Sequence, residues 1–569
     1  MAATVERSLF KYKESGTTSS TAVTTIVKHR FLGFLIWQAV QTTALLFLKS
    51  ILFSPFLRNP LKPSFTASFA FIAFHVSLIL FASSVFLLST PHPLRAASPL
   101  ELLLSSARIV FVPNSSSQPL LSPDFRYRAR VSLCFVLFVG ICGLSAVVSI
   151  VSVCWSAGAF SQLWPWKVII LNLGFRSFGI GLFYGIHYVQ KRRWILQFPI
   201  VQRPSFFSFK MGIPSAITRA LKLTTLGFLM SSFLSFGYPD ELRGQLTVMK
   251  LITDQILLYI GTFMLFLCWE LCHHLHQVLQ TKRFIFSHPK GSAAAETNPS
   301  EPLLLTLEES MPRSLLQYLA YNDLCMVCES NVDSWRRAAF FEETGETYKR
   351  VVDVCLKPLE KFIRSLGEVL DSPSVESSFQ LSNQLRPPSE LLADSKLHES
   401  FDDIQLLAWC ARVVSSLTVS SHTEDRYGVA QLSGSNAAVV STLLSALLAV
   451  EALMGKKTNL ESSHHQMDPT GIKWATLSSS GRRESAPSWG VAGRRKGSPL
   501  YTKAYSMADN LRTSIYCIVI AFHDEMLTSA KTGALDKDWT TTTSNKPPLY
   551  GTQELLLQKL RVFLDFQAN

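Results

Sequence analysis

Long apolar runs alternate with polar, basic or proline-rich gaps through the first half of the chain. A bilayer core about 30 Å thick is crossed by roughly 20 apolar residues in a helix, and backbone groups in that core satisfy one another within helices. The pattern therefore predicts a transmembrane domain over residues 31–275 with six helical spans. The predicted spans are Phe31–Phe53, Thr66–Leu88, Val131–Trp155, Val168–Tyr188, Leu221–Phe236 and Ile252–Leu271.

Basic side chains mark alternate gaps between these spans. They collect before the first span, in the second and fourth gaps and after the last span, whereas the other gaps carry few of them. Lys and Arg are in excess on the cytosolic side of membrane proteins. The charges and the even number of spans both predict cytosolic termini. They also place Asn114, in an Asn-x-Ser sequon, on the side where it stays unglycosylated.

After the last span, apolar residues recur at the three- and four-residue steps of helices with one buried face. The pattern predicts a polar N-terminal tail over 1–30, a Pro- and Ser-rich linker over 276–311 and a cytosolic helical domain over 312–569 with a disordered loop near 458–499. The predicted fold is thus all-α, a six-helix transmembrane bundle followed by a cytosolic α-helical domain. The domain's expected helices are Pro312–Glu329, Gly345–Leu370, Asp402–Leu417, Ala437–Met454, Leu500–Leu527 and Gln553–Phe566. Glu451 and a Ser-rich face favour Ala437–Met454 as a core helix over a seventh span.

The charge balance and the cysteines narrow the functional classes. The chain has 569 residues, a net charge of +13 and ten cysteines. Much of the basic excess lies beside the spans, where it sets topology and meets anionic lipid. No reader motif accompanies it, so direct nucleic-acid binding is not expected. None of the cysteines falls in the short gaps assigned to the lumen, which favours reduced thiols over a disulfide framework.

Arg176 lies inside the fourth predicted span. A charge at mid-membrane costs about 2.5–3.5 kcal/mol on the insertion scale, so this side chain needs polar partners. Carbonyls of neighbouring spans or Asp254 would supply them in a structural role, which the isolation of the charge favours. A role as a substrate or ion ligand in transport is the alternative.

Cysteine and histidine cluster at the end of the last span, from Cys268 to His276, and Cys325 and Cys328 form a single CxxC further on. Structural zinc sites take four ligands, and this CxxC fits inside a helical pattern, so neither a metal nor a cofactor is expected. The sequence has no nucleophile elbow, Walker loop, HExxH or dinucleotide fingerprint. Catalysis is therefore not expected, although a membrane acyltransferase would need only a His with an Asn or Asp.

One short stretch of the second half carries a resemblance to a known family. It contains Leu319-Ala320-Tyr321-Asn322-Asp323-Leu324, Trp335-Arg336-Arg337, Phe340-Phe341, Tyr348 and Val354-Cys355-Leu356. In this order, after six spans with cytosolic termini, these residues resemble the pore-membrane nucleoporins of the "nuclear division cycle protein one" family. The residue-level match covers Leu315–Leu356. Tyr348 stands where Trp is usual and the linker is shorter than usual, as in a divergent member.

The resemblance implies a non-enzymatic protein of the nuclear pore membrane, made in the endoplasmic reticulum. Such a protein tethers scaffold and linker nucleoporins through its C-terminal domain and supports pore assembly. The alternative is a multipass transporter or channel with a cytosolic regulatory domain, which would show polar residues converging at mid-membrane. By the resemblance, the residues that bind partners or hold the domain together are Tyr321, Asp323, Leu324, Arg336, Arg337, Phe340 and Phe341.

Overall fold

A computed structural model of the chain divides into two compact units. The first comprises residues 1–284 with 311–319, and the second comprises 285–310 with 320–569. Throughout the part that the structure describes, the fold is all-α, with one isolated parallel bridge between Thr90 and Ile195. The described residues are 19–53, 65–103, 123–156, 166–199, 202–236, 248–288, 298–371, 397–462, 499–541 and 547–568.

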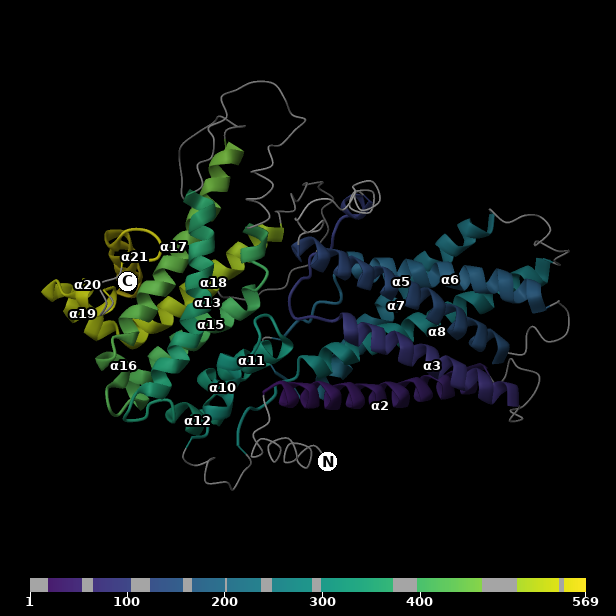
Figure 1. The fold of residues 1–569 in the computed structure, drawn as a ribbon, viewed down its shortest axis with the longest axis horizontal. Helices are drawn as coiled ribbons and strands as arrows, with labels where there is room; N and C mark the ends of the chain where they lie inside the picture. The colour runs from purple at the N-terminus through teal and green to yellow at the C-terminus, as the bar shows by residue number, and fades with distance from the viewer. Residues whose placement is uncertain are drawn as a thin grey trace, which may run out of the picture. The chain divides into compact units, whose positions relative to one another are not determined.

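Six long helices form most of the described part of the first unit and run side by side (Figure 1). Helix α8 is central, because it packs against α2, α3, α5 and α7, while α5 and α6 form the closest neighbouring pair. The side chains that α8 turns inward include Leu265, Phe266 and Trp269, all buried. The helices are α2 (Ser19–Phe53), α3 (Phe65–Leu88), α5 (Pro123–Ser156), α6 (Trp166–Gln190), α7 (Ser205–Phe236) and α8 (Val248–Gln280).

Each predicted span lies within one of these helices, but several helices extend beyond the apolar run. Helix α2 begins at Ser19, inside the expected polar tail, and α8 continues to Gln280, inside the expected linker. Helix α7 begins at Ser205 although its apolar run begins at Leu221. The helices are longer than the predicted spans because helical hydrogen bonding continues through polar residues once a helix leaves the bilayer core.

The second unit is a bundle in which α13, α15, α17 and α18 lie alongside one another (Figure 1). Helix α17 is its centre and contacts α13, α15, α16, α18, α20 and α21. The bounds are α10 (Glu301–Glu309), α11 (Leu315–Glu329, of which residues from 320 belong to this unit), η4 (Asn331–Asp333), α12 (Ser334–Ala338), α13 (Glu346–Asp371), α15 (Ile404–Glu424), α16 (Val429–Leu432), α17 (Ser435–Ser462), α18 (Pro499–Ala521), α19 (His523–Thr532), α20 (Leu535–Trp539) and α21 (Gln553–Ala568).

Length and composition alone mark six helices of the described part as capable of crossing a membrane: α2, α3, α5, α8, α15 and α17. Helix α6, whose side chains are described only from Leu173, and α7 are not among these. The apolar windows of α15 and α17 are 61% and 67% buried, because the other helices of their own bundle cover them. That of α2 is only 17% buried. The window of α8, which is central in the first unit, is 78% buried, so burial separates outer helices such as α2 from central ones in either unit.

The segment expected to be a linker contains helix α10, which packs on α13. Leu303, Leu304 and Leu307 are buried on it, so part of residues 276–311 belongs to the folded second unit. The sequence missed this helix because its nine residues follow a Pro- and Ser-rich run. Most of the loop expected near 458–499 lies outside the described residues, as do Asn114 and the side chain of Asp254.

Candidate functional site

Asp323 on α11 and Arg336 on α12 form an ion pair in the interior of the second unit. Arg336 Nη2 donates to Asp323 Oδ2 at 3.0 Å, and the two side chains are 1% and 0% exposed. Asp323 also accepts from the backbone N–H of Phe286 at 3.0 Å, and Arg336 donates to the Phe286 carbonyl at 2.9 Å. A buried pair with such additional hydrogen bonds fixes geometry, and loss of either partner leaves an uncompensated charge. The pair therefore clamps the chain entering the unit onto α11 and α12.

Arg337, the next residue, ties α12 to the end of α15. Its Nε donates to both carboxylate oxygens of Glu424, at 3.1 and 3.0 Å, and its Nη1 donates to the Cys328 carbonyl at 2.9 Å. The hydrogen bonds that Arg337 donates to Glu424 raise the pKa of Arg337, so the guanidinium stays charged. The two adjacent arginines thus bind different partners, Asp323 and Phe286 for Arg336 and Glu424 and Cys328 for Arg337, through several donors that a Lys would not reproduce.

The apolar members of the predicted set lie in the same interior. Tyr321, Leu324, Phe340 and Phe341 are buried, and the Tyr321 hydroxyl donates to the Val354 carbonyl at 3.0 Å. The Phe341 ring packs on Tyr348, with ring centroids 5.4 Å apart.

The structure therefore brings all seven predicted residues into the interior of the second unit and gives them structural contacts. Phe286 and Glu424, their partners, were not anticipated. Phe286 lies 37 residues before Asp323 and 50 before Arg336, and Glu424 lies 87 residues after Arg337. No periodicity in the sequence links positions so far apart.

Arg176 lies between α6, α7 and α8 and is 7% exposed. Its Nε donates to Ser231 Oγ at 3.0 Å, and its Nη2 donates to Gln255 Oε1 at 2.9 Å. These neutral acceptors on two other helices give the guanidinium the polar surroundings that a charge in a span requires. The geometry favours a structural pairing over a substrate ligand.

The Cys- and His-rich end of α8 contacts neighbouring helices through hydrogen bonds. Glu270 accepts from Arg193 Nη2 at 2.7 Å and from the Tyr184 hydroxyl at 3.0 Å. His273 Nδ1 lies 3.2 Å from the Tyr188 hydroxyl, and His276 Nε2 lies 2.8 Å from Ser89 Oγ. Among the described residues, no three His, Cys, Asp or Glu side chains are grouped to hold a metal ion.

The same end of the first unit gathers four segments that are far apart in sequence. Arg30 on α2 donates to the carbonyl of Gln280, the last residue of α8, at 2.6 Å and to that of Lys282, just after α8, at 2.8 Å. Thr90, after α3, exchanges backbone hydrogen bonds with the 194–196 segment that follows α6. Gln277 Nε2 donates to the Ile195 carbonyl at 3.1 Å. The start of α2, the second and fourth gaps and the end of α8 therefore meet at one end of the helices.

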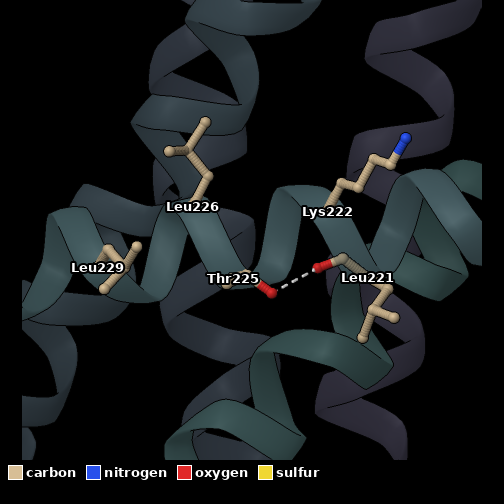
Figure 2. Close-up of a pocket in the computed structure, with 5 residues that line it drawn as sticks. All are labelled: Leu221, Lys222, Thr225, Leu226 and Leu229. Atoms are coloured by element: carbon tan, nitrogen blue, oxygen red, sulfur yellow. Dashed lines mark hydrogen bonds between the residues drawn. The ribbon is translucent and has the colours of Figure 1, made fainter. Parts of the chain in front are cut away.

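A shallow depression of about 440 Å³ lies on α7 (Figure 2). It is lined by Leu221, Lys222, Thr225, Leu226 and Leu229, all from this one helix, and Thr225 Oγ1 donates to the Leu221 carbonyl at 3.0 Å. Substrate sites bring polar groups from several elements together around a deep pocket. This exposed leucine-rich surface instead suits contact with lipid chains.

Comparison with known families finds a match over residues 392–527, to the family described as nucleoporin protein Ndc1-Nup. This match supports an Ndc1-like transmembrane nucleoporin. The matched segment carries α15, α16, α17, α18 and the start of α19, the central helices of the second unit. A search of curated proteins finds no match.

The Ndc1-Nup segment does not include Leu315–Leu356, on which the sequence resemblance rests. The structure joins the two stretches, because Arg337 pairs with Glu424 and α13 packs against α15 and α17. Residues 320–356 therefore pack with the matched segment in one helical unit. The Ndc1-Nup family is one of structural nucleoporins, which supports a role at the pore membrane.

Proposed function

We propose that this Ndc1-like chain anchors scaffold nucleoporins to the pore membrane and supports pore assembly. The observation that carries the proposal is the combination, in one chain, of a helical bundle with an apolar outer surface and a helical unit built around the Ndc1-Nup segment. The bundle supplies attachment to lipid, and the second unit supplies surface for protein contacts. Neither task requires a catalytic group.

The outer surface of the first unit supports insertion into a bilayer. Trp37 and Phe47 on α2, Val136 on α5 and Phe233 on α7 are each at least 60% exposed, and many similar side chains accompany them. Soluble monomers rarely expose apolar patches of more than a few hundred Å². In lipid the same side chains need no cover, and the helical backbone satisfies its own hydrogen bonds.

The contacts at the end of α8 support a topology with both termini on the cytosolic side. The four segments that meet there are the ones whose basic residues predict a cytosolic position, including Arg30, Arg193 and Lys282. An arrangement with these segments on opposite sides of the membrane would be incompatible with their hydrogen bonds. The second unit then lies on the cytosolic side of the membrane, where scaffold nucleoporins assemble.

Localisation of a tagged full-length copy tests the proposal. We expect punctate fluorescence along the nuclear rim that coincides with a scaffold nucleoporin, together with an unglycosylated Asn114. A uniform plasma-membrane or vesicular signal would contradict the proposed anchor. An endoglycosidase-sensitive mass shift that Asn114→Gln removes would contradict the topology, with a sequon in a lengthened 237–250 loop as the positive control.

A further inference from the structure

Four large apolar side chains project from one end of the second unit. Val332 on η4 is 85% exposed and Trp335 on α12 is 55% exposed. Tyr427, just before α16, is 54% exposed, and Leu432 at the end of α16 is 84% exposed. We call these four residues the tip surface. Apolar residues exposed singly are ordinary, but four on two adjoining turns mark a contact site.

The two turns that carry the tip surface are held against each other. Arg337, two residues after Trp335, pairs with Glu424, three residues before Tyr427. Gly345 packs so closely on the second turn that a Cβ on it would lie 2.6 Å from Val429 Cγ1, and its φ of +67° suits glycine. The side chains of Val332 and Trp335 therefore belong to the same local framework as Tyr427 and Leu432.

Each turn is also fixed by its own hydrogen bonds. Ser330 Oγ accepts from the N–H of Val332 at 3.2 Å. Asp425 accepts from the N–H groups of Tyr427 and Ala430, at 3.3 and 2.8 Å. The exposed apolar groups are consequently presented on rigid turns, which lowers the entropy cost of binding a partner.

The surroundings of the tip surface are acidic in a chain whose net charge is +13. Arg336 and Arg337 are buried in their ion pairs, which leaves Arg426 as the exposed base of the two described turns. The acidic side chains on these turns are Asp333 and Asp425, both half-buried. The segment that follows α12 and the start of α13 add Glu342, Glu343 and Glu346, together with one exposed base, Lys349. This charge disfavours contact with anionic lipid headgroups, because carboxylates and phosphates repel each other.

We propose that the tip surface docks a basic amphipathic segment of a partner protein of the pore, an inference that rests on the proposed function. The faces of Trp335 and Tyr427 bind Arg or Lys cations, and Glu343 and Glu346 add charge complementarity. Val332 and Leu432 receive the apolar side chains interleaved with those cations. Exposed aromatic side chains beside carboxylates are the groups from which anchoring contacts to arginine are built.

Site-specific photo-crosslinking in the tagged full-length chain tests the proposal. A benzophenone amino acid replaces Val332 or Leu432, which leaves Trp335 and Tyr427 intact, and Tyr505, 55% exposed on α18, is the control position. We expect probes at 332 and 432 to cross-link one common peptide rich in Arg or Lys. The added pair Glu343→Lys and Glu346→Lys should reduce adduct yield about tenfold, as a loss of about 1.4 kcal/mol in affinity would.

A second pair, Trp335→Ala with Tyr427→Ala, should reduce the yield similarly without a change in net charge. Lipid adducts, an acidic peptide, or yields unaffected by both pairs would overturn the proposal. Nucleoporin adducts from position 505 but not from 332 or 432 would overturn it while leaving the anchoring function intact. No nucleoporin adduct from any position, together with absence from the nuclear rim, would overturn both.

Discussion

The carboxylate of Asp323 and the guanidinium of Arg336 bind each other, and both also bind the backbone of Phe286. The N–H of Phe286 donates to Asp323 and its carbonyl accepts from Arg336, across 37 and 50 residues of sequence. The pair thus incorporates the chain just after the first unit into the second. This relationship sets where a soluble fragment of the protein should begin.

A fragment that starts at Ile285 should be more stable than one that starts at Pro312, the boundary that sequence alone suggests. The shorter fragment loses Phe286 and also helix α10, whose three buried leucines and pairs from Glu301 and Glu308 to Arg350 hold it on α13. Burying one leucine contributes about 1.5–3 kcal/mol, so we expect at least about 3 kcal/mol between the fragments. Urea unfolding followed by circular dichroism measures the difference. Coincident transitions would contradict the assignment of α10 to the second unit.

Asp323→Ala should destabilise the Ile285–Asn569 fragment by about 3–5 kcal/mol, because it leaves the Arg336 charge buried without its partner. Replacing both partners, as Asp323→Leu with Arg336→Met, should cost less than the single change, since no charge is then stranded. Glu360→Ala, which breaks the exposed pair with Arg364, is the control, with an expected cost below about 0.5 kcal/mol. Equal losses for Asp323→Ala and Glu360→Ala in denaturant melts would show that the buried pair is not a clamp.

Gly181→Ala should separate α5 from α6, whereas Gly174→Ala on the same helix should be tolerated. A Cβ at Gly181 would lie 2.4 Å from the Cys142 carbonyl oxygen and 2.8 Å from the Gly143 Cα, while one at Gly174 would meet Val147 Cγ1 at 3.9 Å. Overpacking of this kind costs about 1–3 kcal/mol. We expect a lower melting temperature in detergent for the first variant and an unchanged one for the second. The reverse order would mean that these helices do not pack through Gly181.

The second unit should lose stability in acid partly through Asp536. Side chains of Thr540 and Gln553 donate to this carboxylate and hold its pKa below the usual value. A lowered folded-state pKa stabilises the fold above the unfolded value of about 4, and the contribution is lost as the pH falls through the folded value. Asp536→Asn should therefore lower the urea midpoint at pH 6 and have a smaller effect at pH 3. An equal effect at both values would contradict this linkage.

Hydropathy predicted the six long helices of the first unit because a helix that crosses lipid must be mostly apolar. The Phe65–Leu88 helix, which is mostly apolar and carries no Lys, Arg, Asp or Glu, was placed within one residue at each end. The N-terminal half of α7 was missed, since Lys210, Pro214 and Arg219 interrupt its apolar pattern although the helix continues. Local patterns also cannot identify which distant residue satisfies a buried charge, so Arg337 was selected by resemblance, and only the fold reveals Glu424.

We expect the first unit to localise the chain to the nuclear envelope and the second unit to bind the scaffold nucleoporins. Proximity labelling tests this most directly, with a biotin ligase fused to the C-terminus of the full-length chain or of a fragment ending at Lys290. Both proteins should reach the nuclear envelope, and the full-length chain should label scaffold nucleoporins that the fragment labels weakly. Recovery of the full set of scaffold nucleoporins by the membrane fragment alone would contradict tethering through the second unit.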